Sequence, residues 1–314
     1  AGLVRAKNTN EILTKNVALF AIACTMYLLC GYFIMYSSDA GGIIPNLGVL
    51  IGEENGVDAV LAGGDDAPYY SARSDFFFQV VFVATAMSIV SGAVAERMKL
   101  WSFLLFTVVL TGFIYPVEGY WTWGGGFLSE AGFSDFAGSG IVHMAGAAAA
   151  LAGVLLLGAR KGKYGKNGEI YAIPGANMPL ATLGTFILWL GWFGFNGGST
   201  LAADASIGKV LLNTNLAAAA GVVGTMILLT ALRRPVLITS SVNGALAGLV
   251  AITAGCGSME PVFAVLTGFI AAPIAVFGGD LLLKLRVDDV VGAIPVHGFC
   301  GAWGTLAAGL FLDE

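Results

Sequence analysis

Charged residues are scarce in this chain. Only 11% of its 314 residues are Asp, Glu, Lys or Arg, whereas a soluble globular domain carries about a quarter. Helices with so little charge face lipid or each other, which excludes an ordinary water-soluble domain. The formal net charge of −5 says little about partners, and no nucleic acid is expected among them.

Cysteine is also rare, and the common hydrolase motifs are absent. The four cysteines lie in apolar runs, without a C-x-x-C pair or a metal-ligand spacing to histidine: Cys24, Cys30, Cys256 and Cys300. We therefore expect no disulfide framework, no metal site and no cofactor. Since no G-x-S-x-G or H-E-x-x-H motif occurs, we do not expect an intramembrane enzyme with catalytic residues.

Nine long runs contain no charged residue at all. Each is long enough to cross a bilayer as a helix, which takes roughly 20 residues. The runs are 16–38, 76–95, 100–117, 136–159, 170–203, 210–232, 236–259, 261–279 and 290–312. They lack the short alternation of barrel strands, so the sequence predicts an all-α polytopic membrane protein. In the longest run, Pro174 and Pro179 predict a helix that begins near Met178 and ends near Asn196.

The positive charges follow the sidedness expected of such a protein. If the N-terminal segment is cytoplasmic and the chain alternates sides, thirteen of the fifteen Lys and Arg residues are cytoplasmic. Only Arg73 and Lys209 fall outside. The long stretch 39–75 is rich in glycine and acids and then faces outside, as either a functional loop or a simple decoration.

The spans fall into two groups of four, 16–159 and 210–312, with the odd span 178–196 between them. The odd span makes the two groups enter the membrane from opposite sides. This is an inverted repeat, and its site is expected at the midplane between the halves. We therefore treat residues 1–314 as a single membrane domain, with a first repeat in 1–160 and a second in 170–312.

A weak repeat around the two histidines places both of them deep in the membrane, His143 from the outer side and His297 from the inner side. Asp135 lies eight residues before His143, and Asp289 lies eight residues before His297. At about 1.5 Å per residue, each imidazole lies roughly 12 Å from its aspartate, near the middle of a hydrocarbon layer about 30 Å thick. Facing rings would share one proton and suit a small cargo that donates and accepts hydrogen bonds. The alternative is two unrelated buried histidines, each bonded to a backbone carbonyl.

Several long motifs resemble the ammonium transporter family (Amt/Mep). They include "FFFQVVFVATAMSIVSGAVAERMKLW", "YWTWGGGFL", "DFAGSGIVH", "GWFGFNGGSTLAA" and "RVDDVVGAIPVHGFCGAWGTLAAGLF". The resemblance covers essentially the whole chain and implies a homotrimer in the cell membrane, with one pore and eleven spans per subunit. The chain departs from this pattern because it lacks the first span and stops at Glu314 before the eleventh. Gly140 also stands where many members carry Thr.

By this resemblance, Trp123, Phe78 and Ser199 form an external site that recruits ammonium, and Asp135 supports the site from behind. A desolvated cation over an aromatic face gains about 2 kcal/mol, and a hydroxyl oxygen accepts one of its N–H bonds. We expect Asp135 to be buried and hydrogen-bonded, without contact to the cargo. For Trp123 the alternative is an anchor at the membrane interface.

Farther along the implied path, Phe82 and Phe195 match a gate of stacked rings, and His143 and His297 match the centre of the pore. Ammonium is expected to lose its water and its proton near the gate, because a bare charge is costly in the apolar centre. Neutral ammonia then passes the histidines, which relay the proton. The alternative is an ammonium sensor of the same fold that signals through a fused or paired domain. A cytoplasmic PII-type regulator is a further partner that the family implies.

Overall fold

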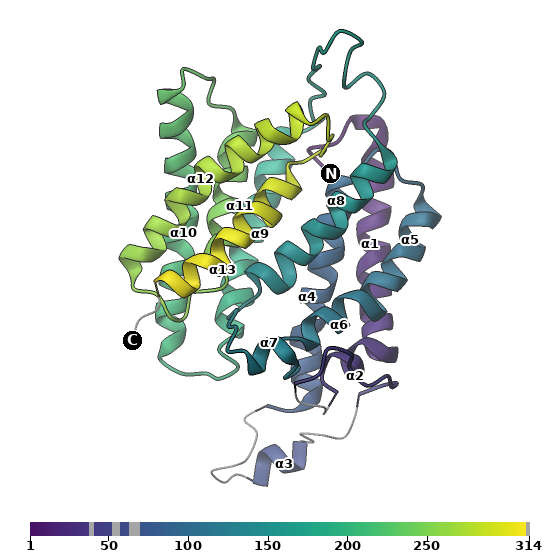
Figure 1. Cartoon of the computed structure of the whole chain (residues 1–314), viewed down its shortest axis with the longest axis vertical. Helices are drawn as coiled ribbons and strands as arrows, with labels where there is room; N and C mark the ends of the chain where they lie inside the picture. Colours follow the sequence, from purple (N-terminus) through teal and green to yellow (C-terminus); the bar gives the residue numbers. More distant parts are fainter. Residues whose placement is uncertain (38–40, 52–56, 63–69, 312–314) are drawn as a thin grey trace.

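The computed structural model of the chain is a bundle of helices (Figure 1). It describes residues 1–37, 41–51, 57–62 and 70–311, so the predicted 39–75 loop lies partly outside the described residues. Within these ranges there is no strand, only an isolated bridge between Tyr164 and Ile170. The predicted class, an all-α polytopic membrane protein, is confirmed.

The first half of the chain runs from the N-terminus to α8. Its elements are the 3-10 turn η1 (Ala6–Asn8), α1 (Thr9–Met26), the π-helical turn η2 (Tyr27–Gly31), α2 (Tyr32–Met35), α3 (Val57–Ala62), α4 (Ala72–Ala93), α5 (Leu100–Val109), the π turn η3 (Leu110–Ile114), α6 (Tyr115–Tyr120), α7 (Phe127–Glu130), the π turn η4 (Ser139–Met144) and α8 (Ala145–Leu157). The N-terminus and the connection after α8 lie at one end of the bundle, and α3 and α7 lie at the other (Figure 1).

The second half runs from α9 to the end of the described chain. Its elements are α9 (Met178–Gly198), α10 (Ser206–Ala231), α11 (Ile238–Ile252), α12 (Pro261–Lys284), the π turn η5 (Ile294–Phe299) and α13 (Cys300–Leu310). In Figure 1 α8 and α13 cross the centre of the bundle in the same view. The two halves contact each other here because η4 packs on α13 and η5 packs on α8.

Each of the nine predicted runs contains a helix, although the helices differ in length. Seven helical segments of the described chain are long and apolar enough to cross a membrane. The runs 236–259 and 290–312 contain shorter helices: α11 has 15 residues, and η5 with α13 covers Ile294–Leu310. Most residues of α11 are buried, as expected for a helix surrounded by others rather than by lipid.

The helix α9 begins where the prolines predicted. The side chain of Asn177 accepts a hydrogen bond from the Leu180 N–H at 2.8 Å, which caps the first turn. Pro179 lies in that turn, where a missing N–H breaks no helical bond. The helix ends at Gly198, two residues beyond the predicted Asn196.

Glycines let three helices of the second half touch through their backbones. A Cβ atom at Gly248 of α11 would lie 2.2 Å from the carbonyl oxygen of Ala217 in α10, and one at Gly268 of α12 would meet the same oxygen at 2.2 Å. At Gly221 a Cβ atom would lie 2.2 Å from the Gly244 carbonyl oxygen. Packing of this closeness is what holds helices together where lipid removes the hydrophobic drive.

The two histidine-bearing helices begin with a π turn rather than an α turn. His143 lies in η4 ahead of α8, and His297 lies in η5 ahead of α13. The regular α-helical rise predicted for these segments is therefore wrong at both turns. Single π turns are rare in proteins and occur frequently at functional sites.

Candidate functional site

The two histidines meet inside the bundle. Their Nδ1 atoms lie 3.2 Å apart, and their ring centroids lie 5.1 Å apart with an angle of 25° between the planes. At this distance one Nδ1 carries the proton and the other accepts it, so one proton is shared along the contact. Side chains that are 154 residues apart in the sequence thus form one polar unit, as the sequence analysis expected.

The environment of His143 leaves one of its nitrogens free. The residue is buried, with 1% of its surface exposed, and Trp192 of α9 stacks on its ring at 5.0 Å and 16°. Its Nε2 has no hydrogen-bond partner within the described chain. A buried ring nitrogen without a partner is costly in an apolar interior, which favours a small polar molecule as its partner. Sequence reasoning missed Trp192, although it lies three residues before Phe195 and so shares its helix face.

A column of aromatic rings leads to the histidines. Phe78 contacts Phe82 edge-on at 4.7 Å, and Phe82 lies 4.0 Å from Phe195 at an angle of 31°. Phe195 in turn lies 5.6 Å from His143 at 27°. Phe82 is completely buried. The pair of Phe82 and Phe195 therefore separates the histidines from the end of α4 that holds Phe78.

Trp123 stands at the start of this column. Its ring meets Phe82 edge-on at 5.8 Å and 90°, and its Nε1 donates a hydrogen bond to the backbone carbonyl of Asp135 at 2.9 Å. Ser199 follows α9, and its hydroxyl donates to the Phe195 carbonyl at 2.9 Å. Gly198 beside it packs against the Phe78 ring. Ser199 is thus adjacent to the column, but no hydrogen bond joins it to Trp123 in the described chain.

Asp135 holds the first turn of the helix that carries His143. Its two carboxylate oxygens accept four backbone N–H groups at 2.7 to 3.0 Å, from the four consecutive residues 138–141. The side chain is buried, with 3% of the residue exposed. Asp135 is therefore buried and hydrogen-bonded, as expected, with its oxygens directed at the backbone. At Gly140, a Cβ atom would lie 3.1 Å from the Thr305 methyl, so Thr305 occupies space beside this glycine.

Asp289 makes the same kind of cap for the helix that carries His297. Its oxygens accept the N–H groups of Val291, Gly292 and Ile294 at 3.3, 3.1 and 2.6 Å. In both caps the third residue after the aspartate is a glycine with a positive φ, +103° at Gly138 and +78° at Gly292. That backbone region favours glycine because it has no Cβ atom. The eight-residue spacing in the sequence therefore reflects one capped turn used twice.

Cavities lie on both sides of the histidine pair. One of about 390 Å³ is lined by His143, Trp192 and Phe195, together with Phe78 and Thr85 of α4. Another, of about 450 Å³, lies beside the end of α4 and is lined by a different group that includes His297, Ser88, Ser91, Thr185 and Asn243. The first is mostly aromatic and apolar, and the second adds hydroxyl and amide groups. The paired imidazoles thus lie between two spaces.

Comparison with known sequences gives a family. A sequence model of the Ammonium Transporter Family matches residues 1–314. The ammonium transporter Amt2 of Archaeoglobus fulgidus is 45% identical over 325 residues, covering 100% of this chain and 67% of that protein. Ammonium transporter 1 member 1 of Arabidopsis thaliana is 36% identical, covering 100% of this chain and 65% of that protein. The chain thus spans about two thirds of the length of these relatives.

Comparison with solved structures gives the same family. A structure described as a Sensor Amt Protein has a TM-score of 0.91 and 38% identity, covering 100% of this chain and 77% of that one. The Mep2 protein of Saccharomyces cerevisiae has a TM-score of 0.87 and 26% identity, covering 100% of this chain and 70% of that one. Both a sensor and a Mep2 protein are therefore similar to this chain over its whole length.

Proposed function

The chain belongs to the ammonium transporter family, and from this membership we propose that it carries ammonium across a membrane along the column of rings that ends at the paired histidines. The family consists of transporters, not enzymes, and its members are multi-pass membrane proteins. The observation that carries the proposal is the contact of His143 with His297 directly behind the stacked rings of Phe82 and Phe195.

Recruitment is the first step. Trp123 and Phe78 offer aromatic faces that both contact Phe82, and Ser199 directly follows Gly198, which packs against the Phe78 ring. A cation over such faces gains about 2 kcal/mol once it has lost water, and a hydroxyl oxygen accepts an N–H bond from ammonium. Asp135 contributes by holding Trp123 through its carbonyl and by adding negative charge behind the site.

Passage of the gate is the second step. The rings of Phe82 and Phe195 lie 4.0 Å apart at their centroids, so ammonium passes only when a ring turns aside and only without its water shell. Nothing in a pair of phenylalanines replaces that water, and an unsolvated charge is expensive within a bilayer. Ammonium therefore gives up a proton near the gate. Potassium cannot do so, which gives the selectivity.

Transfer past the histidines is the third step. The free Nε2 of His143 accepts the proton that ammonium gives up, the Nδ1 proton of His143 passes to the Nδ1 of His297, and the Nε2 proton of His297 leaves on the other side, while neutral ammonia moves past the rings. Neutral imidazole donates at one nitrogen and accepts at the other, so the pair handles a proton without a permanent charge. Neither ring therefore carries a lasting positive charge in the apolar centre.

Assembly follows from the exposed helices. α9 is the least buried of the seven long helical segments, since only 11% of its most apolar 18 residues are buried. Phe186, Ile187 and Leu190 on this helix are more than half exposed. Such a face needs lipid or another subunit, and we propose the homotrimer of the family with one pore per subunit. The chain then acts as one membrane domain, with an inverted repeat relating 1–160 to 170–312. A PII-type regulator would bind the cytoplasmic face.

The test is flux through purified protein in liposomes. An inward gradient of ammonium should produce a pH change or a current above that of empty liposomes, and an equal gradient of potassium should produce none. A channel that passes both ions equally would rule out the gate. Equal signals from protein-free and protein-containing liposomes would rule out transport.

The second candidate function is sensing, which the similarity to the Sensor Amt Protein favours. A sensor would bind ammonium at Trp123 and Phe78 and would conduct little. Calorimetric binding of ammonium combined with no liposome signal would select the sensor. Binding together with flux would select the transporter.

A further inference from the structure

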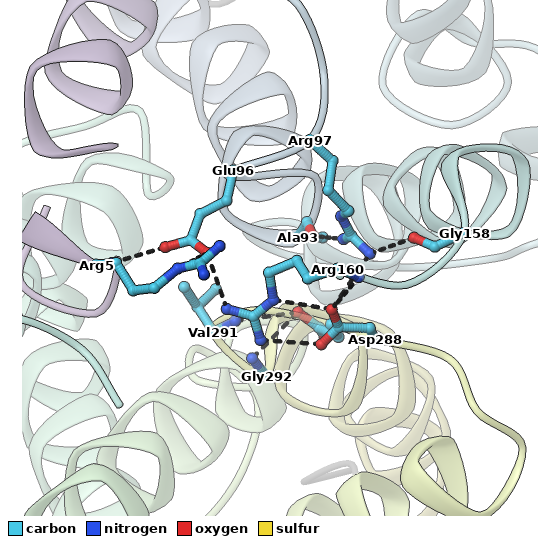
Figure 2. A network of polar contacts seen from close by, with 10 residues as sticks. Arg5, Ala93, Glu96, Arg97, Gly158, Arg160, Asp288, Val291 and Gly292 are labelled. Atoms are coloured by element: carbon cyan, nitrogen blue, oxygen red, sulfur yellow. Dashed lines mark hydrogen bonds and ion pairs between the residues drawn. The ribbon is translucent and has the colours of Figure 1, made fainter. Parts of the chain in front are cut away.

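A network of buried charges lies at the end of the bundle where α4 and α8 finish. Figure 2 shows Arg5 from the N-terminal segment, Glu96 and Arg97 from the turn after α4, Arg160 from the turn after α8, and Asp288 from the segment before η5. The side chains of Glu96 and Asp288 are 0% exposed, and that of Arg160 is 4% exposed. Charges this deeply buried are retained only when they are paired.

Arg160 is the central member of the network. Its Nε and Nη2 donate to the two oxygens of Asp288 at 2.8 and 2.9 Å, and its backbone N–H donates to the same carboxylate at 2.9 Å. Its Nη1 also reaches Glu96 at 3.3 Å. A planar fork of this kind fixes both distance and orientation, which a lysine ammonium does not. The end of α8 is thereby fixed to the segment before η5, 128 residues later in the chain.

The segment that Arg160 fixes is the one that positions His297. Asp288 immediately precedes Asp289, whose carboxylate accepts the N–H groups of the turn that opens η5. His297 lies in that π turn, and its Nδ1 must stay within 3.2 Å of His143 for the proton to be shared. The Arg160–Asp288 salt bridge is thus connected to His297 by only a few residues of backbone, through the cap that Asp289 forms.

The segment is also held by apolar packing, but its charged contacts lie at its start. Ala293 and Ile294 are buried in a core cluster that includes Met87 and Ala147 of the first half. Asn243 donates a hydrogen bond to the Val291 carbonyl at 3.3 Å. Two cavities, of about 450 and 310 Å³, adjoin the segment. Apolar contacts set no fixed direction, whereas the fork from Arg160 and the cap of Asp289 orient the backbone that leads to His297.

From this arrangement we propose that Arg160 is a positioning residue for transport, because its fork on Asp288 holds the Asp289 cap and thereby holds His297 against His143. The role rests on the proposed function of the histidine pair. It is a separate claim about structure, because Arg160 sets the ring geometry whether or not ammonium crosses.

The experiment compares Arg160→Lys with a matched control, Arg234→Lys. Arg234 makes the same fork on a single carboxylate, with Nη1 and Nη2 at 2.7 and 3.0 Å from the oxygens of Asp280. That pair is more exposed and joins the segment after α10 to α12. Both residues line the cavity of about 310 Å³, but within the described chain no hydrogen bond or ion pair joins them to η5 or to either histidine. Both variants keep the charge and lose the fork. Asp288→Asn is the second variant in case Arg160→Lys does not fold.

The readout is the ¹⁵N spectrum of protein labelled only at histidine. The chain contains two histidines, so each ring is observed without overlap. We expect the ring nitrogens of His297 and the Nδ1 of His143 to shift in Arg160→Lys and in Asp288→Asn, and to stay unchanged in Arg234→Lys. Ammonium flux should fall about tenfold or more in the first two, since a misplacement of about 1 Å has effects of this size.

The outcomes separate the two claims. Unchanged histidine spectra in folded Arg160→Lys and Asp288→Asn would overturn the positioning role, even if flux falls or the protein melts earlier. Shifted spectra in a protein whose parent shows no flux would support the positioning role and reject transport. Equal spectral shifts in Arg234→Lys would overturn the role as well, because loss of any Arg–Asp pair near this end of the bundle would then move the histidines.

Discussion

Two aspartates cap the two helices that carry the histidines, Asp135 near one end of the bundle and Asp289 near the other. Asp135 accepts four backbone N–H groups, and Asp289 accepts three. What surrounds the two caps differs. Next to Asp135, Phe136 and Ala137 donate backbone hydrogen bonds to Ala254 and Thr253, both at 3.1 Å. The Asp135 cap is thus joined to the other half of the protein through the main chain.

The Asp289 cap has no such pair of main-chain bonds within the described residues and is joined to the other half through a carboxylate. Asp288 accepts hydrogen bonds from the backbone N–H and the guanidinium of Arg160, and Ile294 packs in the core of the first half. Bonds between main-chain groups are insensitive to substitution and to pH, whereas an ion pair responds to both. One histidine helix is therefore anchored through the main chain and the other through a charged side chain, although the local turn is the same.

Removing the Asp135 carboxylate is the change with the largest expected effect. Asp135→Ala leaves four buried N–H groups without an acceptor, and each costs about 1–3 kcal/mol. We expect a loss of about 4 kcal/mol or more and no stable protein in detergent. Asp289→Ala, with three N–H groups beside cavities that admit water, should lose less. Melting temperatures of the two variants measure the order, and a less stable Asp289→Ala would break the comparison.

Replacing the histidines removes the shared proton. His143→Leu and His297→Leu should each lower ammonium flux in liposomes by about a hundredfold, because the remaining ring has no partner for the relay, a loss at the lower end of what a catalytic proton transfer contributes. Oligomer assembly should be unchanged. Equal losses would place both rings on one route. Full flux in either variant would remove that ring from the relay.

Replacing Trp123 tests recruitment at the Asp135 end. Trp123→Leu removes the aromatic face and the Nε1–Asp135 bond, and the apparent affinity for ammonium should weaken by about tenfold to thirtyfold if the cation gains about 2 kcal/mol there. The matched control is Trp121→Leu, whose Nε1 donates to the Ile43 carbonyl. A normal affinity in Trp123→Leu would return this residue to the role of a membrane anchor.

The last prediction concerns the acid sensitivity of the Asp289 end. Burial raises the pKa of Glu96, but hydrogen bonds and charge from Arg5 outweigh burial and lower its pKa from 4.5 to about 2. Ionised Glu96 therefore stabilises the protein above about pH 4.5, and this contribution disappears as the pH falls through about 2.

Glu96→Gln should then lower stability by about 2 kcal/mol at pH 7 and by progressively less below pH 4.5. Chemical unfolding of the purified protein at several pH values measures the difference. Glu260→Gln, which removes an exposed pair with Lys209, is the control and should show little change at any pH. A difference between Glu96→Gln and the parent that does not vary with pH would contradict the assignment to ionised Glu96.

The sequence predicted the helices and the histidine pair because both depend on local signals. Uncharged runs locate the spans, Pro179 locates the start of α9, and the repeated eight-residue spacing of Asp and His predicts the depth of both histidines. That each aspartate caps a turn is seen only in the structure. The π turns were missed, since the sequence pattern around His143 gave no sign of a π rather than an α turn. The family resemblance supplied Trp123 and Ser199, which composition alone does not distinguish from interface residues.

The charge network could not be predicted for a different reason. Arg160 and Asp288 are 128 residues apart, and Arg5 and Glu96 are 91 apart, so only the folded bundle brings them together. In the sequence these residues resemble the other cytoplasmic charges that the positive-inside rule explains. The cavities around Gly292 likewise follow from packing between helices and leave no mark on the local sequence.

The most direct test of the account is whether ammonium meets the paired imidazoles. Protein labelled with ¹⁵N only at histidine should be titrated with ammonium and, separately, with potassium, and the two rings followed by NMR. The account predicts that ammonium shifts the Nε2 resonance of His143 and that potassium leaves both rings unchanged. Histidine spectra that do not respond to ammonium, in protein that transports it, would contradict the account.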